Sequence, residues 1–442
     1  MVSPADEING GESAIRDVKL STVVPGSITG EDNTYQFTDL DLAMKLHYIT
    51  TVHFYGAAAV EGLGIYDFKK PMFLWLQHCY PICGRIRRRD GGRPFIKCND
   101  SGVRIVEADC SMTVAEWLDR RGGGDHHRLL VYHQPIFAND FGFTPLVFLQ
   151  LTKFKCGGLC VGMRWAHFLG DAFSATQCIN LWGEILATQS LPPHFHLISG
   201  SGPSSGLCLG LGSGLCRSLK MLKPLGDNWL TPNNSKLQMH TFHITQEHLN
   251  DLLAEHDEVR PFELISAYIW KSLAKIRGND AKIIVTVRKK GGSFDRNKLL
   301  GNTHQMIGVV EAKTTSAVAD GNPLDLAKMI GGGKLVDETS VVEKWLGDQN
   351  LDCVVYGSNL TFVNLEEVDL HGLRFKGRSP VFASISIGGV GNGGAVVVGP
   401  AVAKLEDERG GGRSVSVVLP ECEVDYLNNE LRGFWDTVSI RS

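Results

Sequence analysis

Residues 159–171 read Leu-Cys-Val-Gly-Met-Arg-Trp-Ala-His-Phe-Leu-Gly-Asp, and this stretch decides the fold of the chain. It joins a strand-like run, Leu159–Ala166, to a histidine and an aspartate four residues apart, His167 and Asp171. An apolar run at 145–154 and a Gly-Gly turn precede it, which predicts a β-hairpin. Apolar residues then recur at three- and four-residue steps, which indicates a helix with one buried face. We therefore expect His167 and Asp171 at a strand–loop–helix junction.

The chemistry of this pair allows two interpretations. A histidine at such a junction can take a proton from an alcohol or amine near neutral pH, because its ordinary pKa lies close to that pH. With 15 histidines in the chain, about one His-x-x-x-Asp match is expected by chance, so the motif needs its structural context. His167 is therefore either a general base or a buried, hydrogen-bonded histidine, and Asp171 is more plausibly a structural residue than a chemical participant.

Length and composition limit the class of protein. A chain of 442 residues predicts two domains, and 43% hydrophobic with 21% charged residues is typical of a globular protein. A net charge of −4 argues against a nucleic-acid partner. No apolar stretch reaches the ~18–20 residues of a transmembrane helix, and the N-terminus does not resemble a secretory signal. The one dense basic run, Arg85 to Arg89, is interpreted first as a solvated strand end and loop.

Cysteine and histidine spacing does not predict a metal site or a disulfide framework. The 11 cysteines are scattered without a Cys-x-x-Cys pair, which is typical of buried thiols in a reducing compartment. His126-His127 and His194-x-His196 have no clustered third and fourth ligand, so we expect no bound metal.

Changes in composition divide the chain into four parts. Residues 1–16 are polar and expected to be disordered, and 17–188 form an N-terminal domain that contains the His167 motif. Residues 189–235 are rich in glycine, proline and serine, which predicts a crossover between domains. Residues 236–442 form a C-terminal domain. Its predicted elements are strands at 237–244, 283–287, 360–363 and 380–387 and a helix at 262–276.

Residues Gly389–Gly394 match the dinucleotide-binding fingerprint letter for letter, but they are not interpreted as a nucleotide loop. Such a loop must open a helix, whose N-terminus receives the pyrophosphate. Here the strand-like run Ala395–Val398 follows. Asn392-Gly393 is interpreted instead as the turn of a β-hairpin.

The chain resembles the plant BAHD acyl-CoA-dependent acyltransferases over most of residues 17–435. The resemblance rests on the blocks at 38–41, 80–85, 156–171 and 262–271, whose order and spacing agree with the family. It implies an α/β fold of two chloramphenicol-acetyltransferase-like domains with a channel between them. It also implies transfer of an acyl group, other than an amino-acyl group, from acyl-CoA as co-substrate, with His167 as general base and no bound cofactor.

Two further site residues follow from the resemblance. The family aspartate matching Asp171 pairs with an arginine, for which Arg288 is the candidate here. The family's second signature, Asp-Phe-Gly-Trp-Gly, corresponds to Asp369-Leu370-His371-Gly372-Leu373 in this chain. Only Asp369 stays in register, and Gly372 stands where the family has tryptophan, so we expect this loop to follow a different path.

A closer resemblance is to the eceriferum/glossy-type proteins of cuticular wax formation. The blocks that carry it lie at 39–48, 98–108, 145–175 and 359–365. It implies a role beside the condensing enzyme (ketoacyl-CoA synthase) of the fatty acid elongase, in making very-long-chain fatty acids. The place of action would be the cytoplasmic face of the endoplasmic reticulum, reached through that partner, or else the cytosol, with the chain itself monomeric. We favour this accessory role; the alternative is O- or N-acyl transfer by His167.

Overall fold

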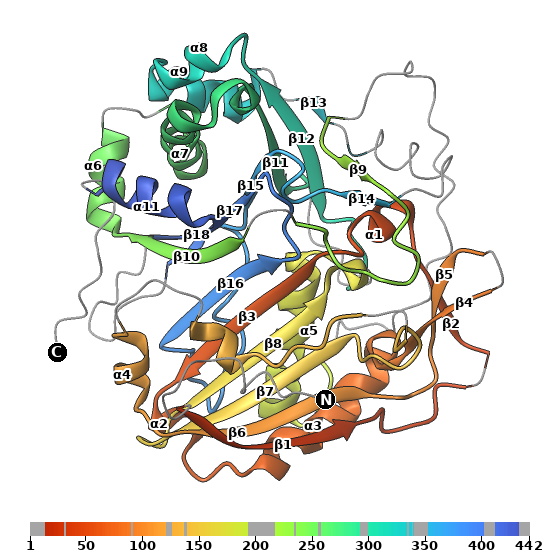
Figure 1. Ribbon diagram of the computed structural model, residues 1–442. Helices are drawn as coiled ribbons and strands as arrows, with labels where there is room; N and C mark the ends of the chain where they lie inside the picture. Colours follow the sequence, from red (N-terminus) through yellow and green to blue (C-terminus); the bar gives the residue numbers. More distant parts are fainter. Residues whose placement is uncertain are drawn as a thin grey trace.

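The computed structural model describes residues 14–30, 32–89, 92–120, 126–136, 139–192, 217–233, 236–254, 258–291, 299–333, 336–337, 339, 352–401 and 412–432. The described elements form two large β-sheets, each with helices packed against it (Figure 1).

The first sheet holds the β-hairpin that the sequence predicts. Its six strands, in spatial order, are β1 (Ile15–Val23), β6 (Val103–Cys110), β7 (Val147–Phe154), β8 (Leu159–Ala166), β3 (Tyr48–Tyr55) and β16 (Phe382–Gly388). Strands β7 and β8 are antiparallel neighbours, with Val147 opposite Trp165. Strand β8 pairs with β3 on its other side, so both of its edges are occupied. The position of the strand's end, where the motif begins, is thereby fixed from two sides.

Two long helices cover one face of this sheet and form most of its core. Helices α3 (Ile65–His78) and α5 (Ala172–Thr188) lie behind the sheet in the view of Figure 1. Two buried indoles tie them together: Trp75 donates to the carbonyl of Cys178 at 2.8 Å, and Trp182 donates to that of Phe68 at 3.2 Å. These bonds satisfy polar groups that would otherwise destabilise an apolar core. The helix predicted after Asp171 is α5.

Smaller elements complete the first half. The helices are α1 (Asp39–Ala43), α2 (Ala57–Val60), α4 (Val114–Leu118) and the 3₁₀ turns η2 (Tyr80–Cys83), η3 (His126–Leu130) and η4 (His167–Leu169). A separate three-stranded sheet contains β2 (Thr34–Gln36), β5 (Pro94–Lys97) and β4 (Arg85–Arg88).

The second sheet has seven strands and its own helical layer. Its strands, in spatial order, are β10 (Leu237–Ile244), β18 (Arg413–Pro420), β17 (Ala395–Pro400), β15 (Leu360–Asn364), β11 (Ile283–Lys289), β12 (Gln305–Glu311) and β13 (Val336–Asp337). Its helices are α6 (Gln246–Ala254), α7 (Pro261–Arg277), η5 (Gly278–Lys282), α8 (Thr315–Ala319), α9 (Pro323–Lys328), the π-turn η7 (Met329–Gly333) and α11 (Glu421–Glu430). The predicted strands at 237–244, 283–287 and 360–363 and the helix at 262–276 are confirmed.

The hairpin predicted around Asn392-Gly393 is wrong. Strand β16 pairs with β3 of the first sheet, whereas β17 pairs with β15 and β18 of the second. Figure 1 shows β16 lying beside β3, far from it in sequence. The loop at 389–394 therefore passes from one sheet to the other, and β16 belongs to the N-terminal sheet although it lies within 236–442. The helix that a nucleotide loop would require is absent at this point, because β17 follows directly.

The predicted N-terminal and crossover segments are described only in part. Strand β1 begins at Ile15, inside the stretch 1–16 that was expected to be disordered; residues 1–13 lie outside the described part. Most of the Gly/Ser-rich crossover, 193–216, also lies outside it. The rest of the crossover forms β9 (Lys220–Leu222), which pairs with β14 (Asp352–Val354), and buries Trp229 completely.

Arg85 is not the solvated side chain that its basic run suggests. It is 6% exposed and donates to five main-chain carbonyls, those of Cys83, Gly84, Ser101, Gly102 and Phe143, at 2.8–3.3 Å. The guanidinium joins the loop 99–102 and the segment around Phe143 to strand β4. Burial of this charge is offset by five charge-assisted hydrogen bonds.

Candidate functional site

His167 occupies the junction that the sequence predicts, but it is buried. It follows the last residue of β8, opens the turn η4 and is 1% exposed. Its main-chain N–H donates to the carbonyl of His47 at 3.1 Å, at the start of β3. The ends of two adjacent strands, β8 and β3, therefore fix the main chain of His167.

Four side chains and one main-chain carbonyl close a ring of hydrogen bonds around His167. Its Nε2 lies 3.0 Å from the hydroxyl of Tyr356, which donates to Oε1 of Gln305 at 3.1 Å. Gln305 donates to Oδ1 of Asn302 at 3.2 Å, and Asn302 donates to the main-chain carbonyl of His167 at 3.0 Å. All four residues are buried.

The direction of these bonds limits the chemistry of Nε2. A phenol has one proton, and the Tyr356 hydroxyl gives it to Gln305, so the phenol oxygen accepts from Nε2–H of His167. In this arrangement Nε2 carries the proton, and Nδ1 is the basic nitrogen. Nδ1 is buried and has no hydrogen-bond partner within the described residues. Neither nitrogen is thus exposed to a substrate.

Burial keeps the histidines of the site neutral. It lowers the pKa of His167 to about 4, while Asp171 and Asn302 act in the opposite direction. Burial also lowers the pKa of His47 to about 3, with the proximity of His167 as a second cause. The pKa of the Tyr356 phenol is raised by burial. At pH 7 all three groups are therefore uncharged, as a low-dielectric environment requires.

Asp41 and His47 hold the ring from outside. Oδ1 of Asp41 accepts from both N–H groups of Asn302, main chain at 3.0 Å and side chain at 2.9 Å. Its Oδ2 accepts from the main chain of Thr38 at 2.9 Å, in the capping box of α1. His47 donates from Nδ1 to the carbonyl of Gly389 at 3.0 Å, and its Nε2 accepts from the main chain of Tyr356 at 3.3 Å.

Sequence reasoning missed most of these partners. Tyr356 and Gln305 stand in no recognisable motif, and only the fold brings them to His167. Asp41 and His47 lie inside the family-like blocks at 38–41 and 39–48, which was the one available signal for them.

Asp171 is a structural residue in this geometry. It is the N-cap of α5, where Oδ1 accepts from the main chain of Ser174 at 3.0 Å. Its Oδ2 accepts from the main chain of His304 at 3.0 Å, in the loop before β12. The carboxylate thus stabilises the helix and joins the two halves of the molecule.

The predicted pairing of Arg288 with Asp171 is wrong. Arg288 lies on β11 and pairs with Glu263 of α7 at 3.0 Å, with its guanidinium 5.1 Å from the ring of Phe262. It also donates to the carbonyl of Ile330. The side chain points into the layer between the second sheet and its helices, whereas Asp171 caps α5 of the first half.

The segment Asp369–Leu373 packs against α5, away from the ring. Asn180 of α5 donates to the carbonyl of Asp369 at 2.9 Å, and the Tyr55 hydroxyl donates to that of Leu373 at 2.7 Å. A Cβ atom on Gly372 would lie 2.2 Å from the Asn180 amide, so a larger residue cannot fit there without a shift. Asp369 and Gly372 therefore act in packing in this chain.

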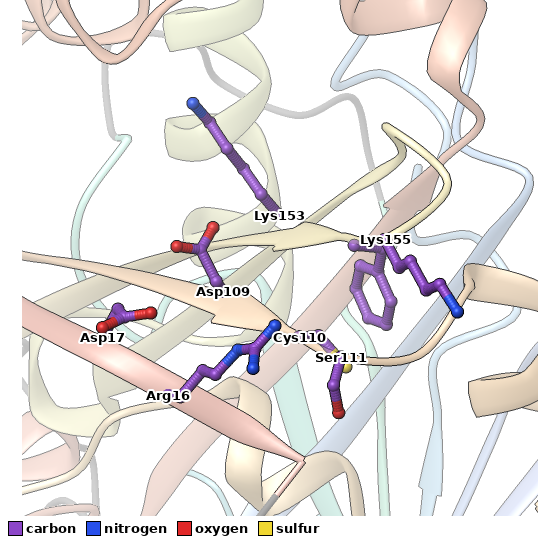
Figure 2. A pocket seen from close by; sticks show the side chains of 8 residues that line it. Arg16, Asp17, Asp109, Cys110, Ser111, Lys153 and Lys155 are labelled. Atoms are coloured by element: carbon purple, nitrogen blue, oxygen red, sulfur yellow. The ribbon is translucent and has the colours of Figure 1, made fainter.

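One hollow of the described part lies well away from His167. A hollow of about 410 Å³ lies at the far end of the β7–β8 hairpin, and Figure 2 shows Arg16, Asp109, Lys153 and Lys155 around it. Eight strand residues separate this end from His167, a distance of about 26 Å. Among the described residues, His, Cys, Asp and Glu form no group that could hold a metal ion. None of the described helices combines the length and the apolar character needed to cross a bilayer.

The fold and the motif together define the class of protein. Residues 15–319 match the model of the Transferase family. The chain belongs to this family, the BAHD acyltransferases, with the two-domain α/β fold related to chloramphenicol acetyltransferase.

Within the family, the chain is similar over nearly its whole length to several Arabidopsis thaliana proteins. The chain is 36% identical to Protein ECERIFERUM 26-like over 96% of both chains. It is 35% identical to Protein ECERIFERUM 26, over 97% of this chain and 98% of that one, and 35% identical to Protein ECERIFERUM 2, over 95% and 98%. The subgroup resemblance seen in the sequence is thereby confirmed.

Solved structures show the same fold at low identity. Vinorine synthase superposes with a TM-score of 0.70 at 18% identity, covering 96% of this chain and 99% of that one. F. graminearum TRI101, complexed with coenzyme A and deoxynivalenol, gives 0.71 at 15% identity, covering 91% and 99%.

Proposed function

We propose that this protein is an accessory factor of very-long-chain fatty acid elongation in cuticular wax formation. It would act beside the ketoacyl-CoA synthase at the cytoplasmic face of the endoplasmic reticulum, and through that partner. The similarity to the ECERIFERUM proteins over nearly the whole chain supports this role. The absence of a membrane-spanning helix among the described residues is compatible with recruitment by a partner.

The observation that carries the proposal is the closed ring around His167. General-base catalysis requires a basic nitrogen within hydrogen-bond reach of the substrate hydroxyl or amine. Here Nε2 contacts Tyr356 at 3.0 Å, the imidazole is 1% exposed, and the phenol and the amide of Gln305 fill the space beside it. A fold that keeps the motif in this state can serve as a binding surface without performing acyl transfer.

Reconstituted elongation tests the proposal. The condensing enzyme is assayed with this protein and with His167→Ala, and the chain-length distribution of the products is measured. We expect the longest products to persist with His167→Ala at more than half of the wild-type level, provided that thermal melting shows the variant folded. Loss of those products with a folded variant would contradict the accessory role.

Association with the elongase is tested separately. An affinity-tagged condensing enzyme, solubilised from microsomes, should retain this protein. Lys70, Lys275 and Lys328 to Ala variants serve as a first surface scan, because these lysines lie on helices of the molecule's exterior. Recovery of the protein only in the soluble fraction, without the enzyme, would remove the basis of the proposal.

A second candidate function is O- or N-acyl transfer from acyl-CoA with His167 as base. Two observations favour it: the histidine is retained at the end of β8, and its lowered pKa, about 4, keeps the ring neutral at pH 7. In that case the Tyr356 side chain would have to move away when the acceptor binds. Release of free CoA that depends on His167 would distinguish this function from the first.

A further inference from the structure

Arg164 lies three residues before His167 on β8 and is unusual among the buried charges. Its Nε is shielded from solvent and has no hydrogen-bond acceptor, and no carboxylate pairs with its guanidinium within the described residues. The guanidinium stacks on the ring of Tyr48, 3.8 Å from the ring centroid. The side chain as a whole is only partly buried, so it can be reached from solvent.

Within the described residues, the groups that act on the charge of Arg164 are a cation, Arg128, and the phenol of Tyr48. Burial lowers the pKa of Arg164, the nearby Arg128 in η3 lowers it as well, and Tyr48 acts in the opposite direction. His133 faces the same pair of arginines, and its pKa is lowered to about 4 by burial and by both of them. Tyr48 is the remaining ionisable neighbour, and its raised pKa keeps it neutral. We call Arg128, His133, Arg164 and Tyr48 the cationic recess.

The sequence positions these groups by a close backbone approach. Gly162 precedes Arg164 on the same face of β8, and a Cβ there would lie 2.0 Å from the carbonyl oxygen of Leu130. Only glycine allows the segment after η3 to lie directly on the strand. That contact brings the segment holding Arg128 and His133 alongside Arg164. Phe148, opposite Arg164 on β7, is buried and contacts the partly exposed ring of Tyr132, with 5.5 Å between the ring centroids.

Arg85 shows what a structural arginine looks like in this protein. Its guanidinium is saturated by five main-chain carbonyls, whereas the guanidinium of Arg164 stacks on a ring and has no carboxylate partner within the described residues. A buried Nε–H without an acceptor destabilises the free protein, and such unsatisfied groups are typical of binding sites.

We infer that the cationic recess is a binding site for an oxyanion, a carboxylate or phosphate carried by a small ligand. The planar fork of a guanidinium matches either group by paired hydrogen bonds; Arg128 adds positive charge, and the neutral imidazole of His133 can add a hydrogen bond. The partly exposed ring of Tyr132 is suited to an apolar part of the same ligand. The inference does not depend on the state of His167.

Calorimetric titration and thermal melting of the full chain test the site. The probes are inorganic phosphate, octanoate and coenzyme A at constant ionic strength, which separates a carboxylate source from a phosphate source. We expect at least one probe to bind the wild type and raise its Tm. Arg164→Met should weaken that binding by about tenfold to a hundredfold, the loss expected for charge-assisted bonds. Arg164→Lys should retain part of it.

The stability of the free variants gives an independent result. Arg164→Met should melt at the wild-type temperature or above it, because it removes an unsatisfied group, while the matched control Arg85→Met should melt lower. The inference is overturned if no probe binds the wild type, or if Arg164→Met and Arg164→Lys both bind as the wild type does. It is also overturned if Arg164→Met melts as far below the wild type as Arg85→Met.

Discussion

The ring around His167 and the cationic recess around Arg164 lie three residues apart on one strand, yet they differ in almost every physical respect. In the ring, buried neutral groups bond to one another, apart from Nδ1 of His167, and leave almost no exposed surface. In the recess, a second cation, Arg128, lies beside a partly exposed guanidinium that has no carboxylate partner within the described residues. His167, which belongs to the family motif, therefore has the properties of a structural site. Arg164, which belongs to no motif, has those of a ligand site.

Acidification should have the largest effect, and it acts on the buried histidines. Burial lowers the pKa of His47 to about 3 and the pKa values of His53 and His167 to about 4, whereas unfolded histidines take up protons near 6.5. Above pH 6.5 these histidines are neutral in both the folded and the unfolded state. As the pH falls from 6.5 toward 4, the unfolded state takes up protons that the folded state excludes, so the free energy of unfolding decreases. The loss amounts to about 3 to 5 kcal/mol for each group. Native stability is only about 5–15 kcal/mol.

Thermal melting between pH 7.5 and 4.5 checks this expectation. The Tm should fall steeply below pH 6.5, and His53→Leu should fall less steeply because one titrating group is gone. An equal Tm at pH 7 and pH 5 would contradict this expectation, because it would mean that water reaches these imidazoles in the folded protein.

The second expected effect concerns Asn302, which links the ring to Asp41. Asn302→Ala removes hydrogen bonds to Asp41 and to the carbonyl of His167 and leaves the Gln305 amide without its acceptor. We expect a loss of about 2 to 4 kcal/mol in the free energy of unfolding by urea. Asn33→Ala, an exposed control, should cost only a few tenths of a kcal/mol. A cost as small as that of the control would mean that the ring does not hold the site together.

The smallest of these effects is expected for the Tyr356 hydroxyl. Tyr356→Phe keeps the ring of the side chain and removes the bonds to His167 and Gln305, which should cost about 1 to 2 kcal/mol. Tyr66→Phe, at an exposed position, should be neutral. Equal urea midpoints for the two variants would argue that the Tyr356 hydroxyl contributes no net stability.

The sequence predicted the local elements of the site well because they depend on local patterns. The apolar runs flanking the Gly-Gly turn gave β7 and β8, and the apolar spacing after Asp171 gave α5. The aspartate's capping role is compatible with its place directly before that helix.

Contacts between distant segments could not be predicted in this way. Asn392-Gly393 has the composition of a hairpin turn, but β16 found its partner in β3, more than 300 residues earlier. Arg288 was predicted to pair with Asp171, but its position on β11 places it beside Glu263 instead. The bond between Nε2 of His167 and Tyr356 joins residues that are 189 positions apart in the sequence. Local spacing carries no signal for any of these contacts.

The central claim is that Tyr356 and Gln305 prevent a substrate from reaching the imidazole of His167. Its most direct test is the release of free CoA from a very-long-chain acyl-CoA in the presence of a long-chain alcohol, measured with the wild type and with His167→Gln. The account predicts that both proteins release CoA at the same background rate. Release by the wild type at ten times the rate of the variant, with both folded, would contradict it.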